Sequence, residues 1–242
     1  MTDELKTYYD DTQKPWGKLF YKIIWEQLSF AQSMKVLDFG SGFGITTAYL
    51  ASKNDVTAIE PNKIMCEKGI KNEDYKLIIG GLNELAGFAN ETFDLIICHN
   101  VLEYIDNKDD YIAEFCRLLK VGGRLSLIKH NRMGRVFHKV AFENNLSEAL
   151  QVINGEAVSA KCFGEIKYYD KDDLAKWSEN YGLKHIDSFG IRTFFALHSD
   201  NTVRFGDEWF DYMYELEVKA SSVGEFRDVA FYNHVILEKC MF

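Results

Sequence analysis

The residues with the clearest capacity for chemistry lie in one stretch, 34–50, with the sequence MKVLDFGSGFGITTAYL. A short apolar strand ends there at Asp38, and Gly40, Gly42 and Gly44 follow at alternate positions. Glycine has no Cβ, so the backbone can turn sharply and approach a ligand closely. A helix begins directly after the turn, and we expect unpaired backbone N–H groups at its N-terminus. The pattern predicts a small-molecule site near residue 40.

The spacing of these glycines differs from the dinucleotide fingerprint G-x-G-x-x-G, which needs a glycine where this chain has Ile45. Asp38 would repel a pyrophosphate but suits a ligand that carries an ammonium or sulfonium cation. The turn resembles the first motif of the class I S-adenosylmethionine-dependent methyltransferases. We therefore expect the cofactor S-adenosyl-L-methionine, bound by Asp38, Gly40, Ser41, Gly42 and Gly44. A nicotinamide oxidoreductase and a glycine turn without a ligand are the less favoured alternatives.

A second acid ends the next predicted strand, Asp55–Glu60 (DVTAIE). Glu60 lies 22 residues after Asp38, about the separation at which nucleotide-binding α/β folds place a carboxylate on the ribose hydroxyls. We expect Glu60 to accept hydrogen bonds from the ribose hydroxyls, with an ordinary charge at a strand end as the alternative, and Pro61 beside it to belong to the cofactor site. Asn62 is expected to cap the following helix.

A third predicted strand, Tyr75–Ile79, precedes a short segment at which the resemblance implies contacts with the adenine ring. These contacts would come from Gly81, Leu82 and Asn83.

Two polar residues follow the fourth predicted strand, 93–98. Ligands in open α/β sheets bind beyond the carboxyl ends of the strands, so we expect His99 and Asn100 to face the methionine end of the cofactor or the acceptor. His99 is a candidate catalytic residue, and a purely structural histidine is the alternative. Further acids, Asp106, Asp109 and Asp110, lie at the start of a predicted helix, 111–119, where they would compensate the helix dipole. No metal site is predicted.

A glycine pair precedes the fifth predicted strand, 124–128. We expect Gly122 and Gly123 to supply positive φ angles there. The methyltransferases have a similar Leu-x-Pro-Gly-Gly turn, and Val121 replaces its proline. The resemblance covers roughly residues 30–130. It implies an α/β fold with a Rossmann-like, seven-stranded, mostly parallel sheet, helices on both faces, and an antiparallel last strand.

The other predicted elements lie at the two ends of the chain. Apolar periodicity predicts an N-terminal amphipathic helix at 16–30 and a helix at 207–220 whose stripe packs inward. We expect a helical insertion at 134–152, a helix capped by Asp170, and closing strands at 182–195 and 226–237. The stripe of the helix at 207–220 consists of Trp209, Phe210, Met213, Leu216 and Ala220.

Length and composition predict one domain. The 242 residues and 47% hydrophobic content fit a single domain with a helical cap (1–33), a cofactor-binding half (34–130), and a substrate-side insertion with closing strands (131–242). The five cysteines have no metal-ligand spacing and suggest reduced thiols of a cytosolic protein. They are Cys66, Cys98, Cys116, Cys162 and Cys240. No signal-like N-terminus or long apolar run is present, so we expect a cytoplasmic location and no membrane span.

The net charge of −9 argues against a nucleic-acid partner, yet one stretch is strongly basic. Residues 129–142 (KHNRMGRVFHKVAF) contain four Lys or Arg, two His and no acid. A weaker basic group is Lys14, Lys18 and Lys22. A solvated surface is the alternative for both groups.

Motifs outside the common core support a narrower resemblance, to the tRNA carboxymethoxyuridine methyltransferase family. They are His99 in HNVLEY, Asn131-x-x-Gly134 followed by His138, and Arg192 in GIRTF. That family methylates the carboxylate of a wobble uridine.

A carboxylate acceptor has a reference pKa of about 4, so it needs no general base at neutral pH. We therefore expect Arg192, the second candidate catalytic residue, to hold this anion bidentately. The predicted substrate-binding residues are Asn131, Arg132, Arg135, His138 and Arg192. Arg132, Arg135 and Lys139 would meet RNA phosphates. Lys18 or Lys22 would replace an arginine with which that family holds the cofactor carboxylate.

Two further functions fit the same cofactor residues. A small-molecule O- or N-methyltransferase would suit the acidic net charge better. A non-catalytic module that only binds S-adenosylmethionine or S-adenosylhomocysteine is the other alternative.

Overall fold

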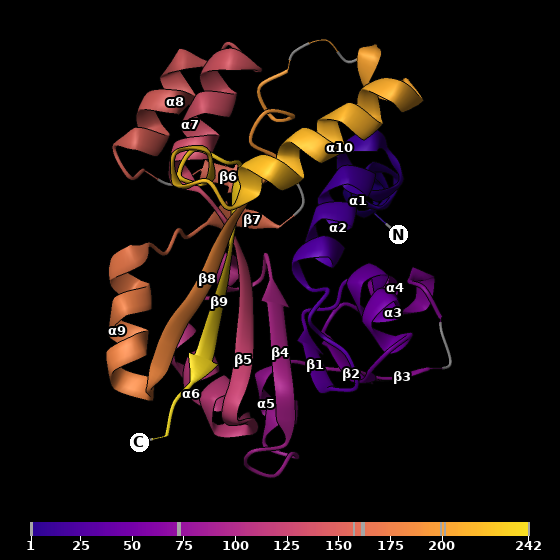
Figure 1. The fold of residues 1–242 in the computed structure, drawn as a ribbon, viewed down its shortest axis with the longest axis vertical. Coiled ribbons are helices and arrows are strands. Elements are labelled where there is room, and N and C mark those ends of the chain that lie inside the picture. Colours follow the sequence, from indigo (N-terminus) through magenta and orange to yellow (C-terminus); the bar gives the residue numbers. More distant parts are fainter. Residues whose placement is uncertain are drawn as a thin grey trace. The chain divides into compact units, whose positions relative to one another are not determined.

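The computed structural model describes residues 2–71, 74–156, 158–160, 163–198, 200 and 202–241 (Figure 1). Its contacts divide the chain into two compact units. Unit 1 comprises Met1–Gln27, Lys129–Tyr168 and Ser188–His234. Unit 2 comprises Leu28–Ile128, Tyr169–Asp187 and Val235–Phe242.

A seven-stranded sheet has the strand order β3-β2-β1-β4-β5-β9-β8. Its strands are β1 (Lys35–Phe39), β2 (Asp55–Glu60), β3 (Tyr75–Ile79), β4 (Phe93–His99), β5 (Leu119–His130), β8 (Leu183–Ile191) and β9 (Tyr232–Lys239). The pairs from β3 to β5 are parallel, whereas Figure 1 draws β9 pointing against β4 and β5. The continuous apolar runs of β1 and β4 are buried, as strands covered on both faces must be. The predicted Rossmann-like sheet is confirmed.

The helices of unit 2 follow the strands as expected from their capping residues. They are α3 (Ile45–Ala51), α4 (Lys63–Lys68), α5 (Leu82–Leu85), α6 (Lys108–Leu118), α9 (Lys171–Tyr181) and the 3₁₀ turn η1 (Leu102–Tyr104). The Asn62 side chain accepts hydrogen bonds from the N–H groups of Ile64 and Met65, so its predicted role as a cap is confirmed. Asp170 is the N-cap of α9, also as predicted.

The glycine pair before the fifth strand differs from the prediction. Helix α6 ends at Leu118 and β5 begins at Leu119, so residues 120–123 form a bulge inside the strand rather than a turn before it. Gly122 has φ of +77°, but Gly123 is outside the left-handed region. A Cβ on Gly123 would lie 2.8 Å from the carbonyl oxygen of Lys120, so close backbone approach is the reason for glycine there.

Unit 1 consists mainly of helices. They are α1 (Asp3–Gln13), α2 (Pro15–Gln27), α7 (Arg132–Ala141), α8 (Leu146–Ile153), α10 (Asp207–Ser221), α11 (Gly224–Arg227) and the 3₁₀ turn η2 (Val203–Phe205). A two-stranded sheet of β6 (Val158–Ala160) and β7 (Gly164–Ile166) follows α8. The expected N-terminal helix is confirmed as α2, and its buried positions include Leu19, Ile23 and Ile24.

Three predicted elements of the C-terminal half have different bounds. The helical insertion is two helices, α7 and α8, separated at residues 142–145. The closing strands are shorter than predicted, because β8 ends at Ile191 and α11 occupies the start of the second segment. Arg192 has φ of +60°, a left-handed conformation that an extended strand does not contain.

The predicted inward stripe of α10 is wrong at one position. Leu216 is 45% exposed, whereas its neighbour Glu217 is 1% exposed. The Glu217 carboxylate accepts hydrogen bonds from the N–H groups of Thr193, Phe194 and Phe195, each at 2.8 Å. These three buried donors need an acceptor, and a glutamate turned inward satisfies all of them.

The described cysteines are free thiols. Cys66, Cys98 and Cys116 are buried, and Cys240 is half-buried. Cys162 lies outside the described residues. In the part of the chain that the structure describes, no helix has the length and apolar character that crossing a bilayer requires.

Gly134 on α7 lies directly against the backbone of Ala230 and Phe231, where a Cβ would overlap the carbonyl oxygen of Ala230. We expect Gly134→Ala to lower the free energy of unfolding by about 3 kcal/mol, because neither backbone can move aside cheaply. Urea unfolding measures this. Gly206→Ala is the control, because a Cβ at Gly206 meets only contacts of 3.5 Å or more at an ordinary φ of −79°. Equal losses for both variants would contradict this explanation.

Candidate functional site

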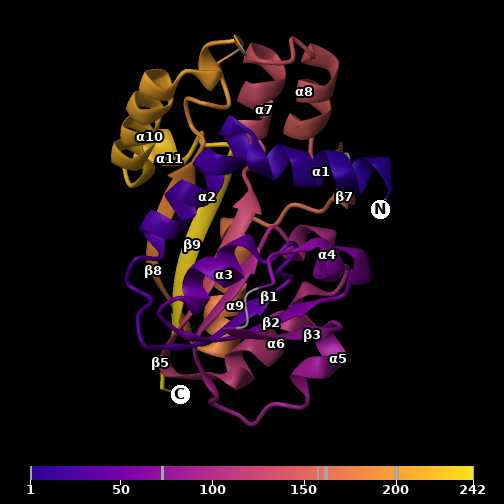
Figure 2. The ribbon, with the colours of Figure 1, turned by 90° about the vertical axis from the view of Figure 1, so that its right-hand side faces the viewer.

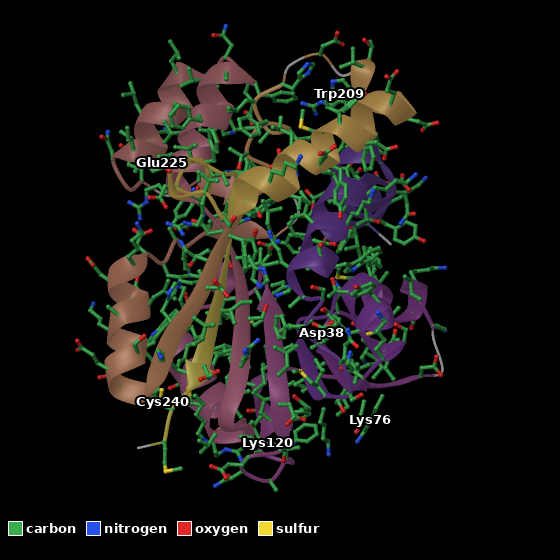
Figure 3. The ribbon with its side chains drawn as sticks, viewed as in Figure 1. Asp38, Lys76, Lys120, Trp209, Glu225 and Cys240 are labelled. Atoms are coloured by element: carbon green, nitrogen blue, oxygen red, sulfur yellow. The ribbon has the colours of Figure 1, made fainter. Side chains whose placement is uncertain are left out.

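Asp38 is a buried carboxylic acid on β1 of unit 2 (Figure 3). It is 4% exposed, and its Oδ2 accepts a hydrogen bond of 2.5 Å from the Thr47 hydroxyl. Burial raises the pKa of Asp38 from 3.8 to about 7, and the nearby charge of Glu60 adds to the effect. A cation beside Asp38 would favour its ionised form.

The backbone N–H groups of the glycine turn donate hydrogen bonds within the protein. The N–H groups of Gly40 and Ser41 donate to the carbonyl oxygen of Ile59, that of Gly44 to the carbonyl of Ser41, and that of Gly42 to Glu60 Oε2. These four N–H groups of the turn are therefore paired, because buried N–H groups pair wherever an acceptor is in reach. The expectation of unpaired donors concerned the helix that begins at Ile45, and it stays a prediction.

The space available for a side chain differs among the three glycines of the turn. A Cβ on Gly40 would overlap the side chain of Val101, and one on Gly44 would lie 2.9 Å from the Tyr75 hydroxyl. A Cβ on Gly42 would meet only Met65 Cε, at 3.4 Å. All three have positive φ. Gly42 is thus the glycine of this turn with the most space beside it.

Glu60 is buried at the end of β2, and both of its carboxylate oxygens are bound. Oε2 accepts from Gly42 N–H and Oε1 from Asn62 N–H, each at 2.8 Å. Burial raises the pKa of Glu60, although these two hydrogen bonds oppose the increase. Each oxygen retains a second lone pair, so the carboxylate can still accept from a ligand hydroxyl. Pro61 is exposed beside it.

Two polar side chains follow at the end of β4, as predicted. His99 Nε2 lies 2.8 Å from the Ser126 hydroxyl. Asn100 has φ of +54°, and its N–H donates to the carbonyl oxygen of Ile128. Its Oδ1 is buried and has no hydrogen-bond partner among the described residues. A buried acceptor of this kind in a strained residue is typical of a ligand-binding position.

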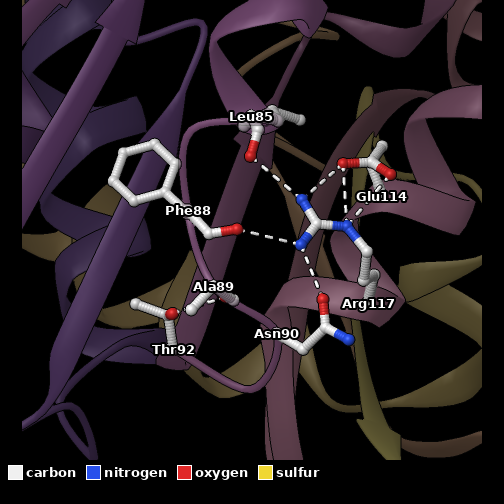
Figure 4. A network of polar contacts seen from close by, with 7 residues as sticks. All are labelled: Leu85, Phe88, Ala89, Asn90, Thr92, Glu114 and Arg117. Carbon is white, nitrogen blue, oxygen red and sulfur yellow. Dashed lines mark hydrogen bonds and ion pairs between the residues drawn. The ribbon is translucent and has the colours of Figure 1, made fainter.

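Leu82 and Asn83 line a cavity of about 410 Å³ in unit 2, together with Ala86, Glu114 and Arg117. Figure 4 shows that Arg117 is fixed by Glu114 and by the carbonyl oxygens of Leu85 and Phe88. The N–H of Gly81 donates to Glu84 at 2.6 Å, so this amide is already used within the protein.

The predicted acidic cluster before α6 serves the helix. Asp109 and Asp110 lie in its first turn, where they offset the helix dipole. Asp109 also accepts a hydrogen bond from Trp177 Nε1, and Asp110 from Asn107. Among the described residues, no group of three potential metal ligands gathers at any point.

A second cavity, of about 290 Å³, lies within unit 1. Two predicted substrate residues, His138 and Arg192, line it. Sequence reasoning missed the other lining residues, which are Asp11, Trp16, Phe142, Ala196 and Arg204. The spacing of Phe142 four residues after His138 on a helix was an available signal, because such pairs share a face. Nothing in the sequence pattern distinguished Arg204.

Arg192 is one of three charged residues that line this cavity, with Asp11 and Arg204. Its guanidinium lies 5.4 Å from the ring centre of Phe195 and 5.2 Å from that of Phe231. Within the described residues it forms no ion pair and no hydrogen bond, and its Nε is buried. Burial lowers its pKa, although the charge of Glu217 is among the groups that oppose this. A half-buried cation without an ion pair is costly, although the Asp11 carboxylate lines the same cavity and favours the charged form of Arg192.

Arg135 adds positive charge beside Arg192. Its guanidinium lies 5.0 Å from the centre of the same Phe231 ring, and it too has no ion pair in the described part of the chain. The ring holds both cations through its negative faces. Their mutual repulsion would be relieved by a bound anion.

His138 contributes an aromatic surface rather than a charge. Burial, with further contributions from Arg192 and Arg135, lowers its pKa to about 4 although Glu143 opposes the change. Its ring stacks on Phe142 at 4.8 Å. The imidazole is therefore neutral at physiological pH.

Other predicted substrate residues have structural contacts. The Asn131 side chain caps α7 and donates to the carbonyl oxygens of Asp228 and Ala230, so both of its N–H donors are used. Arg132 lies over the Tyr168 ring at 5.2 Å. Arg204, which was not predicted, donates to the carbonyl oxygens of Phe195 and His198.

The basic stretch 129–142 is turned inward, so its interpretation as a phosphate-binding or solvated surface needs correction. Lys129, His130 and Lys139 are all buried. Lys139 pairs with Glu143 at 2.7 Å and Glu148 at 3.0 Å, so it is not available to RNA phosphates as predicted. Acids brought close by the α7–α8 connection neutralise it, and sequence order alone did not reveal this.

Two of the three lysines of the weaker basic group in unit 1, Lys14 and Lys22, are also engaged. Lys14 pairs with Asp11 at 2.9 Å and lies over the Trp16 ring. Lys22 lies 3.8 Å from the ring centre of Tyr214. Exposed cations that already contact acids or aromatic rings are poorer phosphate ligands than the sequence suggested.

Glu217 positions the backbone that carries Arg192. We expect Glu217→Ala to lower the free energy of unfolding by roughly 3 kcal/mol, because three buried N–H donors lose their acceptor. Denaturant unfolding measures the loss. Glu215→Ala on the same helix is the control, since Glu215 is exposed and pairs with Lys219 on that helix. Similar stabilities of the two variants would rule out this role.

Comparison with known proteins agrees with the arrangement in unit 2. Residues 37–127 match the family model described as a methyltransferase domain. A ubiquinone/menaquinone biosynthesis C-methyltransferase of Shewanella pealeana is 29% identical over 170 residues, 63% of this chain and 67% of that protein. The tRNA 5-carboxymethoxyuridine methyltransferase of Escherichia coli K12 is 27% identical over 142 residues, 53% of this chain and 54% of that protein. The chain thus spans between half and two thirds of the length of these relatives.

A solved structure has the same fold. The 1,6-didemethyltoxoflavin-N1-methyltransferase of Burkholderia thailandensis, with bound 1,6-didemethyltoxoflavin and S-adenosylhomocysteine, aligns with a TM-score of 0.58. The alignment covers 97% of this chain and 85% of that one at 14% identity. At this identity the likeness concerns the fold alone.

Proposed function

Because this chain belongs to the class I S-adenosylmethionine-dependent methyltransferases, we propose that it methylates an acceptor whose anionic group is held by Arg192. The observation that carries the proposal is the half-buried guanidinium of Arg192, whose buried Nε has no hydrogen-bond partner and which forms no ion pair among the described residues. Arg135 and the aromatic walls of the unit 1 cavity support the same assignment.

The residues of unit 2 fit the cofactor. Asp38 is a buried acid with a raised pKa, and a bound cation would favour its ionised form. Asn100 Oδ1 is a buried acceptor that has no hydrogen-bond partner among the described residues. Gly42 leaves space where a side chain would stand, and Glu60 keeps lone pairs for ribose hydroxyls. We assign these four residues to cofactor binding, with Gly40, Ser41 and Gly44 shaping the turn. The roles of Pro61, Gly81, Leu82 and Asn83 stay predictions.

When bound, S-adenosylmethionine supplies a methyl group on a positively charged sulfur. The protein's own part in the reaction is to orient and desolvate the acceptor. Arg192 would hold a carboxylate in its fork, and the rings of His138 and Phe142 would keep water from it. A carboxylate is ionised at neutral pH, so no general base is required. His99, held by Ser126, is proposed as a positioning residue.

A small anionic molecule is the acceptor that the geometry favours. The unit 1 cavity, at about 290 Å³, has the size of a small-molecule pocket. The basic stretch that would meet RNA phosphates is largely buried or paired, and the net charge is −9. A modified tRNA is the second candidate, favoured by the 27% identity with an enzyme whose name gives that substrate.

Methyl transfer from tritiated S-adenosylmethionine tests both candidates. The protein is incubated with extracted tRNA from cells that lack it, and separately with the small-molecule fraction of the same cells. We expect the label in a product of the small-molecule fraction that is stable to acid or labile to base. Mass spectrometry identifies this product. Label in tRNA nucleosides would select the second candidate, and the absence of label from every fraction would reject both acceptor proposals. The predicted division into segments 1–33, 34–130 and 131–242 stays a prediction.

A further inference from the structure

The unit 1 cavity contains a second guanidinium besides that of Arg192. The residues that line the cavity come from α1, α2, the end of α7 and the segment that joins β8 to α10 (Figure 2). In that segment Arg204 is 4% exposed and forms no ion pair with a described residue. Its guanidinium lies 4.4 Å from the centre of the Phe195 ring, on which Arg192 also lies, at 5.4 Å. Two cations of one cavity therefore share an aromatic ring.

The hydrogen bonds of Arg204 leave donors for a ligand. Its Nη2 donates to the carbonyl oxygens of Phe195 and His198. Its Nε is buried and has no hydrogen-bond partner among the described residues. A guanidinium has five N–H donors, and two of them suffice for these carbonyls. Arg192 makes no hydrogen bond within the described part of the chain, so its donors are unused as well.

The acids near the two arginines already have other partners. Asp11 lines the cavity and pairs with Lys14 at 2.9 Å. The Glu217 carboxylate accepts hydrogen bonds from three backbone N–H groups. Asp200, whose charge favours the protonated form of Arg204, is exposed and accepts hydrogen bonds within its own loop. The lining of the cavity thus has two cations and one acid, and that acid is paired with a lysine.

The two guanidinium charges destabilise each other. Burial lowers the pKa of Arg204, and the charge of Arg192 lowers it further. Like charges repel each other more strongly where water is excluded than in bulk solvent. One carboxylate in the fork of Arg192 would neutralise a single charge and leave the other without an anion. A ligand with two negative charges neutralises both, because the planar fork of arginine matches carboxylate and phosphate oxygens alike.

We propose that the acceptor in the unit 1 cavity is a small dianion, with its two negative charges held by Arg192 and Arg204. The inference rests on the proposed function, from which it takes that Arg192 holds an anionic group of the acceptor. Dicarboxylates and phosphomonoesters are the two sources of such a charge. The cavity, at about 290 Å³, restricts the ligand to a small molecule. Arg204 is then the residue that selects a dianion over a monoanion.

Isothermal titration calorimetry of the full chain at pH 8 tests the proposal with two matched pairs of probes. Succinate has two carboxylates and butyrate one, on carbon chains of equal length. Methyl phosphate and methyl sulfate are both tetrahedral, but at pH 8 the phosphate carries close to two charges and the sulfate one. We expect the dianion of at least one pair to bind about tenfold more tightly than its monoanion. The pair that shows this preference identifies the source of the second charge.

Two variants of Arg204 separate its charge from its contacts with the backbone. Arg204→Gln keeps a donor for the carbonyl oxygens but removes the charge, so the preference for the dianion should disappear. Arg204→Lys keeps the charge, and part of the preference should remain. A purely structural role would not distinguish the two variants. Arg227→Met is the matched control, because Arg227 pairs with Asp228 at 3.3 Å and does not line the cavity, and it should keep the full preference.

The comparison of probes in the unchanged protein does not depend on the folding of any variant. Equal affinities for dianion and monoanion in both pairs would overturn the proposal, as would a preference that survives in Arg204→Gln. Arg192→Met distinguishes this failure from failure of the proposed function. If the preference is absent but monoanion binding is lost in Arg192→Met, only the dianion proposal is wrong. If no probe binds, or Arg192→Met binds every probe as the unchanged protein does, both proposals are wrong.

Discussion

Asp38→Asn is expected to gain stability relative to the unchanged protein as the pH rises, and to lose affinity for the cofactor. Burial raises the pKa of Asp38 from 3.8 to about 7, so between these values the folded state binds more protons than the unfolded state. The unfolding free energy of the unchanged protein therefore falls as the pH rises through this window. The cost, fully present above pH 7, is about 4 kcal/mol. Asparagine has no charge to bury.

Urea unfolding of both proteins at pH 4.5 and pH 8 measures this effect. The buried amide of the variant needs an acceptor for its own N–H groups, which costs roughly 1–3 kcal/mol at either pH. The diagnostic quantity is therefore the difference in unfolding free energy between the variant and the unchanged protein, and how much that difference changes from pH 4.5 to pH 8. Asp94→Asn is the matched control, because the hydrogen bond from Lys120 keeps the pKa of Asp94 below its usual value although partial burial opposes it.

The control variant Asp94→Asn should show a pH dependence of stability with the opposite sign. Asp94 stabilises the folded state once it is ionised, so the Asp94→Asn variant is expected to lose stability relative to the unchanged protein as the pH rises. If both variants followed the same pH dependence, the buried charge of Asp38 would not be its cause.

Cofactor binding gives the second measurement on Asp38. A cationic ligand group binds the ionised acid, so the affinity of the unchanged protein for S-adenosylhomocysteine, through its ammonium group, should rise up to about tenfold per pH unit below 7 and level off above it. In Asp38→Asn this dependence should disappear, with an affinity roughly 10- to 100-fold lower at pH 8. Calorimetry at pH 6 and pH 8 separates the two proteins. Equal affinities would remove Asp38 from the proposed cofactor site.

Arg192→Met is expected to lower kcat/KM by roughly 100-fold while leaving the free energy of unfolding unchanged or higher. The acceptor anion loses a charged fork, which is worth a few kcal/mol in a desolvated cavity. The folded protein loses a half-buried cation that forms no ion pair among the described residues, and methionine fits beside the rings of Phe195 and Phe231. Methyl-transfer kinetics and urea unfolding of the same preparation provide the two measurements.

Two further variants make the result specific to Arg192. Arg192→Lys keeps the charge but not the planar fork, so an intermediate rate is expected. Arg124→Met removes a guanidinium that lies 4.7 Å from the Phe30 ring and 3.8 Å from Glu238, outside the cavity, and should leave kcat/KM unchanged. Unchanged turnover of Arg192→Met, or an equal loss in Arg124→Met, would exclude the proposed role.

The sequence by itself predicted the first five strands along the chain and the glycine turn after β1, whereas the seven-stranded sheet was an expectation from the family resemblance and its strand order came from the structure. The strands and the turn depend on local signals, because continuous apolar runs specify buried strands and a residue such as Asn62 specifies where a helix begins. The type of cofactor also followed from the sequence. An acid before the glycines and an isoleucine at position 45 distinguish a cationic ligand from a diphosphate without any knowledge of distant contacts.

The tertiary structure decided which charges are available. The run of cations at 129–142 suggested a solvent-exposed basic surface. In the structure Lys139 forms ion pairs with Glu143 and Glu148, and the guanidinium groups of Arg135 and Arg192 both contact the Phe231 ring. The tertiary structure also turned Glu217 inward and Leu216 outward, against the apolar period of α10. Whether a side chain is exposed or paired depends on residues far away in the chain, and neither composition nor periodicity contains that information.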